Sequence, residues 1–200
     1  AAFQKILDYE VPGVELDVHL CRTGELVVTH DFNLQRITGL DSAIEETDYA
    51  AIAELDAGAW FSEEFRGEKV PLLDDVMDLL GEKVFYDIEI KSNCRKCGPL
   101  ESALAETVRK RDFDNRVMIS SFNPFSIREM RRIDKTIPTA LIYVKHEHIP
   151  WYLRRGEGRF FSRPTALKPN RHQITRQNMF LQKELEGYPI ITWTENDPKK

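Results

Sequence analysis

The sequence has 200 residues, and its 28 lysine and arginine residues against 33 aspartate and glutamate residues give a formal charge of −5. A hydrophobic fraction of 42% and a charged fraction of 30% are ordinary for a folded domain and exclude a disordered, collagen-like or coiled-coil chain. No stretch approaches the roughly 20 apolar residues of a membrane span, and no basic stripe is available to neutralise the phosphates of a nucleic acid.

Signals for strands and helices alternate along the chain, which indicates βαβ units and a parallel sheet. The first half is expected to contain a helix over 1–9, a hairpin of strands 14–20 and 25–30, a long segment over 32–70 with a helical patch at 49–55, a helix over 71–80 and a strand over 84–91. The second half is expected to contain helices over 100–111, 126–133 and 175–185 and strands over 116–121, 138–144, 166–168 and 189–194. No linker rich in proline, glycine or serine divides the sequence, so we predict a single domain over residues 1–200.

The strand expected over 14–20 alternates ionisable residues with aliphatic ones. Because successive side chains of a strand point to opposite faces, Glu15, Asp17 and His19 share one face. In a closed parallel barrel this face would point at the axis, where unpaired carboxylates are costly and would favour a cation with oxygen ligands, Mg²⁺ or Ca²⁺. An edge strand with one solvated face would show the same alternation.

The strand expected over 84–91 repeats the pattern, since Asp87, Glu89 and Lys91 share one face and two isoleucines share the other. If it lies beside the first strand, three or four carboxylates and a lysine converge. Such a cluster would make a metal site with a positive charge for a phosphate oxygen. A ladder of charges on the protein surface is the alternative.

His30 follows the second strand of the hairpin, in Thr29-His30-Asp31. A histidine at the end of a strand can act as a general acid or base. A lone histidine is more often structural or merely exposed, so the pattern by itself leaves both roles open.

The chain has three cysteines, an odd and low number that does not suit a disulfide framework and favours a reducing compartment such as the cytoplasm. Cys94 and Cys97 form a single C-x-x-C, and no second pair of cysteines or histidines is spaced to complete a zinc site. A plain loop is the favoured interpretation, with a local disulfide or a metal clip as alternatives.

Motifs along most of the chain resemble the glycerophosphodiester phosphodiesterase family. In chain order they are E-L-D-V-H-L at 15–20, G-E-L-V-V-T-H-D at 24–31, D-A-G-A-W-F at 56–61, E-I-K at 89–91, S-F-N at 121–123 and W-T-E-N at 193–196. Each motif is modest alone, but their joint order and spacing are specific.

The resemblance implies a (β/α)8 TIM barrel with its site at the carboxyl ends of the strands and a small inserted subdomain, residues 32–70, after the hairpin. It implies an enzyme, a phosphoric diester hydrolase. The expected reaction is metal-dependent hydrolysis of glycerophosphodiesters, such as glycerophosphocholine or glycerophosphoethanolamine, to sn-glycerol 3-phosphate and an alcohol by histidine acid/base catalysis. Such a role belongs to glycerol and lipid metabolism.

The resemblance also assigns the site residues. The metal ligands would be Glu15, Asp17 and Glu89, holding Mg²⁺ or Ca²⁺. The catalytic residues would be His30 and Lys91, and the substrate-binding residues would be Lys91, Phe122 and Trp193. The expected partner is a small glycerophosphodiester, with no nucleic acid and no stable membrane insertion, while the head group, the choice of metal and the oligomeric state are not given by the sequence.

The sequence has no counterpart of the family's N-terminal H-R-G, which holds the other catalytic histidine, of the following P-E-N-T or of the last barrel strand. We therefore expect a barrel incomplete at both ends and a sequence that is a piece of a longer protein. Two alternatives stay open: a catalytically inactive module that binds phosphodiesters, and a phospholipase D-type relative that acts on lysolipids. For a lipid substrate, the aromatic residues of 151–161 would supply an exposed apolar rim.

Overall fold

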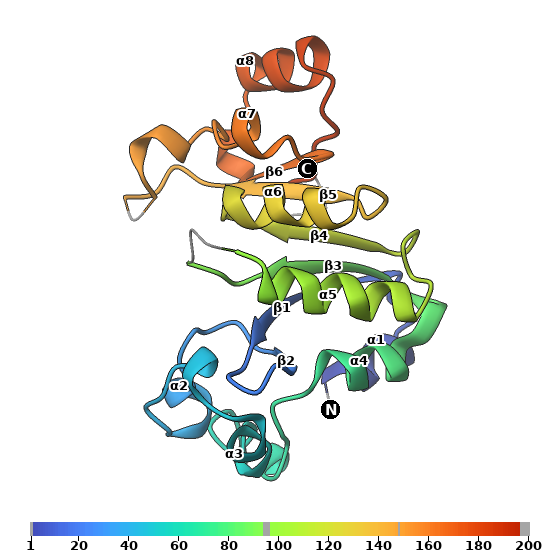
Figure 1. The fold of residues 1–200 in the computed structure, drawn as a ribbon, viewed down its shortest axis with the longest axis vertical. Helices are drawn as coiled ribbons and strands as arrows, with labels where there is room; N and C mark the ends of the chain where they lie inside the picture. The colour runs from blue at the N-terminus through green and yellow to red at the C-terminus, as the bar shows by residue number, and fades with distance from the viewer. Residues whose placement is uncertain (1, 94–96, 148, 197–200) are drawn as a thin grey trace.

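The computed structural model describes residues 2–93, 97–147 and 149–196, which form one α/β unit (Figure 1). Its strands are β1 (Gly13–Leu20), β2 (Leu26–Val28), β3 (Phe85–Ile90), β4 (Val117–Ser121), β5 (Thr139–Tyr143) and β6 (Ala166–Pro169). Its α-helices are α1 (Ala2–Asp8), α2 (Gln35–Thr38), α3 (Tyr49–Glu54), α4 (Leu73–Leu80), α5 (Pro99–Lys110), α6 (Pro124–Ile133), α7 (Arg159–Ser162) and α8 (Arg176–Met179), the last continued by a π-helical segment, Phe180–Leu185. Short 3₁₀ turns lie at Ile44–Glu46, Glu63–Phe65, Gly81–Lys83, Trp151–Leu153 and Arg171–Gln173.

The six strands described form one sheet in the order β2-β1-β3-β4-β5-β6. β1 and β2 pair antiparallel as the expected hairpin, and every other pair is parallel. The parallel pairs are joined by helices, because strands of the same direction need a long crossover. In the register of β1 with β3, Asp17 lies opposite Glu89 and Glu15 lies opposite Asp87.

The two faces of the sheet differ in chemistry. Helices α4, α5 and α6 cover one face, which we call the outer face (Figure 1). There Leu16, Val18 and Ile88 pack against Leu80 of α4 and Leu104 of α5, all of them buried. Because the side-chain period of a strand is two, the same strands turn their carboxylates to the opposite, inner face. Burial of the outer face therefore fixes where the polar residues lie.

Residues 32–70 form a segment of short helices beside β2 (Figure 1). Their apolar side chains, among them Leu34, Ile44 and Ile52, are fully buried in a hydrophobic cluster distinct from the one beneath α4 and α5. The D-A-G-A-W-F motif makes a tight turn in this segment, where the Asp56 carboxylate accepts hydrogen bonds from the backbone N–H groups of Gly58, Ala59 and Gly67. These bonds lower the pKa of Asp56.

Two elements differ from their expected form. The strand expected over 189–194 is reduced to two isolated parallel bridges, Ile190 with Leu167 of β6 and Trp193 with Asn170, the residue directly after β6. The chain follows the edge of β6 but pairs with it only at these points. The helix expected over 175–185 is one α-helical turn followed by the π-helical segment. Within the described residues, no helix combines the length and the apolar character needed to cross a bilayer.

Candidate active site

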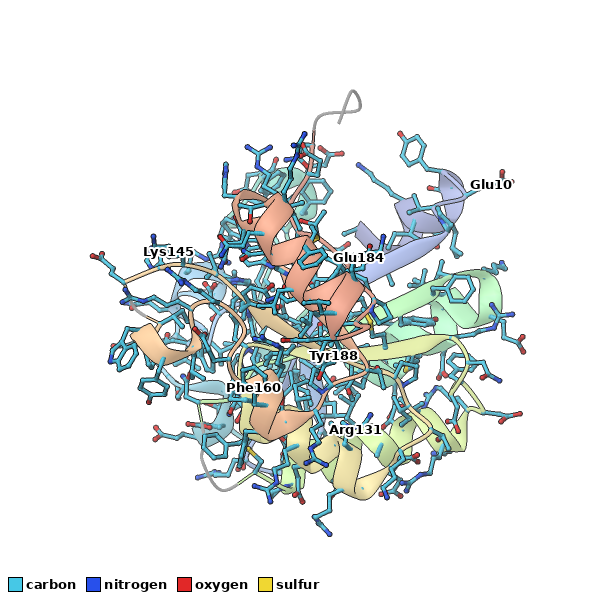
Figure 2. The ribbon with its side chains drawn as sticks, turned by 90° about the horizontal axis from the view of Figure 1, so that it is seen from above. Glu10, Arg131, Lys145, Phe160, Glu184 and Tyr188 are labelled. Atoms are coloured by element: carbon cyan, nitrogen blue, oxygen red, sulfur yellow. The ribbon has the colours of Figure 1, made fainter. Side chains whose placement is uncertain are left out.

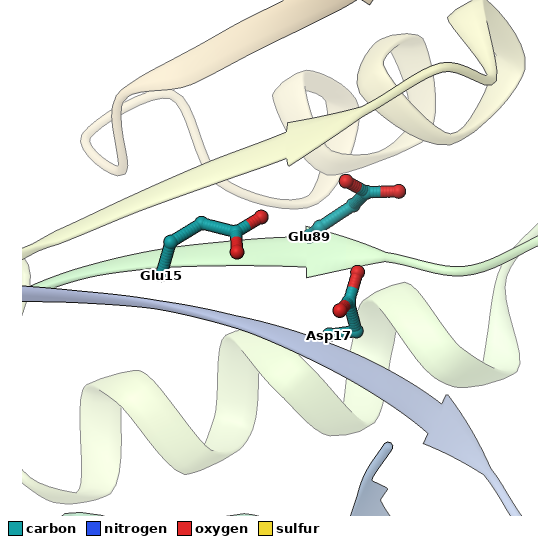
Figure 3. Close-up of side chains that lie close together, drawn as sticks. All are labelled: Glu15, Asp17 and Glu89. Carbon is teal, nitrogen blue, oxygen red and sulfur yellow. The ribbon is translucent and has the colours of Figure 1, made fainter. Parts of the chain in front are cut away.

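Three carboxylates meet on the inner face of the sheet (Figure 3). Glu15 and Asp17 come from β1 and Glu89 comes from β3, and one oxygen of each lies within 4.8 Å of the others. The parallel register brings them together, since Asp17 is directly opposite Glu89 and Glu15 is two residues back on the same face. The structure thus gathers all three residues that the resemblance assigned to a metal.

Lys91 lies against this carboxylate group, directly after β3. Its Nζ is 2.9 Å from Oε1 of Glu89 and 3.1 Å from Oδ1 of Asp17. Burial disfavours the charged ammonium, but attraction to Glu89 and Asp17 and hydrogen bonds with both carboxylates outweigh it, so the pKa of Lys91 is raised. Lys91 is therefore a positive charge held at the edge of the group.

A second lysine, Lys168 of β6, enters the same face and was not identified from the sequence. Its buried Nζ is 2.6 Å from Oδ2 of Asp87, 3.4 Å from Oγ of Ser120 and 3.7 Å from Oε1 of Glu15. The hydroxyl of Ser120 donates a hydrogen bond of 2.6 Å to the other oxygen of Asp87. Lys168 and Asp87 thus form a nearly buried ion pair next to Glu15.

The charges of this face suit a divalent cation. When all are ionised, the four carboxylates and two ammonium groups carry a net charge of −2, which one divalent ion would neutralise. These groups belong to Glu15, Asp17, Asp87, Glu89, Lys91 and Lys168. Burial raises the pKa of Glu15 and of Glu89, and neighbouring carboxylates raise both further. A bound cation would favour the ionised forms. Oxygen donors of this kind suit Mg²⁺ or Ca²⁺, so the residues present fit the expected metal.

His30 lies at the rim of the face, two residues after β2. Its imidazole is largely exposed, and Nδ1 is 2.9 Å from Oδ1 of Asp31. His30 and Lys91 line one surface hollow of about 410 Å³, together with Phe32 and Arg36. The structure therefore brings both residues expected to be catalytic to the same opening.

The two aromatic residues expected to bind substrate contact each other. Phe122 directly follows β4, and its ring meets that of Trp193 edge to face with 5.6 Å between centroids. The indole Nε1 of Trp193 donates a hydrogen bond of 3.0 Å to the backbone carbonyl of Lys168. This bond anchors the segment over 189–194 to β6 and places Trp193 at the carboxyl end of that strand.

Other features of the described residues do not compete with this site. Glu15, Asp17 and Glu89 are the one group of three metal-ligating side chains that the described ranges contain. A larger hollow of about 730 Å³ lies between α1, α4 and the 32–70 segment, and its lining is mainly apolar. The expectation of a loop, a disulfide or a metal clip at Cys94 and Cys97 cannot be followed at Cys94, which lies outside the described residues. Sγ of Cys97 is 3.4 Å from Oγ of Ser126.

Parallel strands covered by helices on one face, with an acidic cluster on the other, have the arrangement of the α/β barrel class, in which the inner face of the sheet carries the site toward the carboxyl ends of the strands. The glycerophosphoryl diester phosphodiesterase family matches this chain over residues 1–200. The chain belongs to that family, which confirms the resemblance seen in its motifs.

Relatives of the chain carry the same family name. A glycerophosphodiester phosphodiesterase of Caldanaerobacter subterraneus subsp. tengcongensis is 36% identical over 154 residues, which cover 76% of this chain and 63% of the relative. One from Bacillus subtilis is 32% identical over 153 residues, covering 67% of this chain and 52% of the relative. The chain thus spans between half and two thirds of these relatives.

Solved structures of the family share the fold. An Oleispira antarctica phosphodiesterase, in complex with the product sn-glycerol-3-phosphate, superposes with a TM-score of 0.79 at 24% identity and covers 98% of this chain and 78% of that chain. A Thermotoga maritima glycerophosphodiester phosphodiesterase gives a TM-score of 0.72 at 25% identity and covers 99% of this chain and 79% of that chain. The predicted (β/α)8 barrel fold class is confirmed, with six strands of the sheet in the part of the chain that the structure describes.

We predict that Lys168→Met lowers the free energy of unfolding by about 3 kcal/mol, because the nearly buried carboxylate of Asp87 then lacks its counter-ion. The double substitution Lys168→Met/Asp87→Leu should recover most of this loss, since both charges are gone. Urea denaturation at neutral pH, with a chelator present so that no metal contributes, measures both.

Arg66→Met is the matched control for the lysine substitution. The side chains of the Arg66–Glu63 pair are 62% and 74% exposed, so losing it should change the free energy of unfolding by less than about 1 kcal/mol. An equal loss in the single and double Lys168 variants would contradict the prediction, because the cost would then not come from an unpaired charge.

Proposed function

We propose that this protein hydrolyses glycerophosphodiesters, such as glycerophosphocholine or glycerophosphoethanolamine, to sn-glycerol 3-phosphate and an alcohol. The observation that carries the proposal is the meeting of Glu15, Asp17 and Glu89 beside Lys91 in a chain of this family. The product bound to the Oleispira antarctica relative supports the same substrate class. One water is consumed: over the whole reaction its hydroxyl becomes bonded to phosphorus, the bond between phosphorus and the alcohol oxygen breaks, and the other proton of the water reaches that oxygen.

Glu15, Asp17 and Glu89 would hold the divalent metal, Mg²⁺ or Ca²⁺. When bound, such an ion supplies Lewis-acid polarisation of a phosphoryl oxygen. These carboxylates are already restrained, because Lys91 binds Asp17 and Glu89 and Lys168 lies near Glu15. The lysines would therefore orient the ligands as well as balance their charge.

Lys91 and His30 would act on the phosphodiester itself. The ammonium of Lys91, at the hollow it shares with His30, would attract a phosphate oxygen and stabilise charge that develops there. Asp31 binds Nδ1 of His30 and would leave Nε2 as the nitrogen that transfers a proton to or from the reacting oxygens. Phe122 and Trp193 would bound the substrate on the side of β4 and β6.

We also propose a cytoplasmic location and a place in the metabolism of glycerol and lipids. The odd number of cysteines, three, does not suit a disulfide framework. Cys21 is a buried thiol whose Sγ donates a hydrogen bond of 3.1 Å to Oε2 of Glu25. A reducing compartment would preserve that thiol.

We expect enzyme-coupled release of sn-glycerol 3-phosphate from glycerophosphocholine with Mg²⁺ or Ca²⁺ and none with excess chelator. Glu89→Gln should lower kcat/KM by about 100-fold or more, because it removes a metal ligand next to the phosphate site. Glu106→Gln, an exposed position on α5, is the control for the same change and should keep full activity. Release that persists in chelator or in Glu89→Gln would refute the metal site, and a folded protein that binds Mg²⁺ without any release would favour the inactive binding module.

His30→Asn should lower kcat by about 10² to 10⁴, the usual contribution of acid–base catalysis, because the amide cannot transfer the proton. Binding of Mn²⁺ should be unchanged, since His30 is not among the three carboxylate donors. His172→Asn, at another exposed histidine, should behave like the unchanged protein. An unchanged kcat in His30→Asn would remove His30 from the mechanism.

A further inference from the structure

The outer surface of α6 carries a row of basic side chains that the site does not use, and the expectation that the chain holds no basic stripe is wrong at this helix. Arg128, Arg131 and Arg132 follow the spacing i, i+3 and i+4, which places them along one stripe of the helix. Lys135 follows the end of α6 and lines the same hollow as these arginines. Arg163, directly after α7, faces them across a surface hollow of about 520 Å³ that Phe160 and Phe161 also line. We call these five basic residues and two phenylalanines the α6–α7 patch.

Most cations of the patch form no salt bridge with another described residue. Of its five basic residues, Arg132 alone forms a salt bridge with a described residue, Glu129. Arg159, which α7 buries beside the patch, is by contrast paired with Glu186 at 2.7 Å. Since the whole chain has a formal charge of −5, the patch is a local concentration of positive charge on an acidic protein. Its charge is therefore complementary to an anionic partner.

Aromatic side chains stand among these cations. Phe160 is 68% exposed and Phe161 is 41% exposed. Figure 2 shows Phe160 on α7 beside Arg131 on α6. The guanidinium carbon of Arg128 is 4.4 Å from the ring centroid of Phe161, which also meets Phe125 edge to face at 5.0 Å. An exposed ring between basic residues is typical of the boundary between lipid head groups and acyl chains.

We propose that the α6–α7 patch docks this protein on the surface of a bilayer containing anionic phospholipids. The five basic side chains bind lipid phosphates, and Phe160 enters the head-group region. Each lysine or arginine near such a surface adds to the attraction, and an inserted aromatic ring adds an apolar contribution that salt does not screen. The protein lies on the bilayer without spanning it.

A bilayer fits these observations better than a nucleic acid. Single-stranded nucleic acids bind by stacking bases on open aromatic faces. Here Arg128 and Phe125 contact the ring of Phe161, and the Arg159 guanidinium carbon lies 4.1 Å from the ring centroid of Phe160. These contacts cover ring surface on which a base would stack. The basic residues also form a compact patch on an acidic chain rather than a continuous groove.

Docking through this patch leaves the carboxylate site open. On its inward side, α6 packs Ile127 against Leu141 and Tyr143 of β5. Glu89 and Asp17 lie on the opposite face of the sheet, which therefore separates the two surfaces. Substrate and bilayer would not compete for the same residues.

The test is co-sedimentation of the protein with vesicles of phosphatidylcholine, alone or mixed with phosphatidylglycerol, at low and high salt. We expect binding to the mixed vesicles only, with Arg128→Gln/Arg131→Gln weakening it about tenfold or more at low salt. Phe160→Ser should weaken the binding that remains at high salt. Inorganic phosphate at millimolar concentration should not release the protein, because several lipids bind at once.

Lys110→Gln/Lys183→Gln is the matched control, since it removes two exposed charges outside the patch. Thermal unfolding monitored by circular dichroism verifies that all variants are folded. The proposal is overturned if the unchanged protein ignores mixed vesicles, if the control weakens binding as much as the patch variant, or if an RNA oligonucleotide binds through the patch while vesicles do not.

Discussion

Gathering four carboxylates on one partly buried face of a sheet is costly, and the rest of the site depends on how that cost is met. Like charges this close repel one another, and burial disfavours the ionised form, so the pKa values of Glu15 and Glu89 are raised. Lys91 and Lys168 offset part of the cost because each binds the carboxylates nearest to it. The two negative charges left over are the reason for which we propose one divalent cation.

The geometry of this cluster follows from packing on the other side of the sheet. Leu16, Val18 and Ile88 are buried under helices, and their alternation with Asp17 and Glu89 fixes which side chains face inward. A slip of one residue in the register of β1 and β3 would turn the carboxylates toward the helices and the aliphatic residues away from them. The hydrophobic core and the candidate site therefore constrain the same two strands.

Part of this arrangement can be predicted from the sequence. Glu15, Asp17 and Glu89 lie in strands with an unbroken period of two, so their shared faces follow from the pattern. The position of Lys168 cannot be predicted in this way, because β6 has only four residues and shows no clear alternation. The ion pair of Lys168 with Asp87 also depends on the order of all strands in the sheet. Likewise the segment over 189–194 has the composition of a strand, but it forms only two isolated bridges, one with Leu167 of β6 and one with Asn170 directly after β6.

The most direct test of the account is calorimetric titration of the protein with Mn²⁺, a divalent probe that accepts oxygen ligands. We predict one bound ion per chain, and at least about tenfold weaker binding in Glu15→Gln/Asp17→Asn. Glu106→Gln, on the exposed side of α5, should bind as the unchanged protein does. Absence of binding, or binding that survives the double substitution, would contradict the assignment of the inner-face carboxylates to a metal.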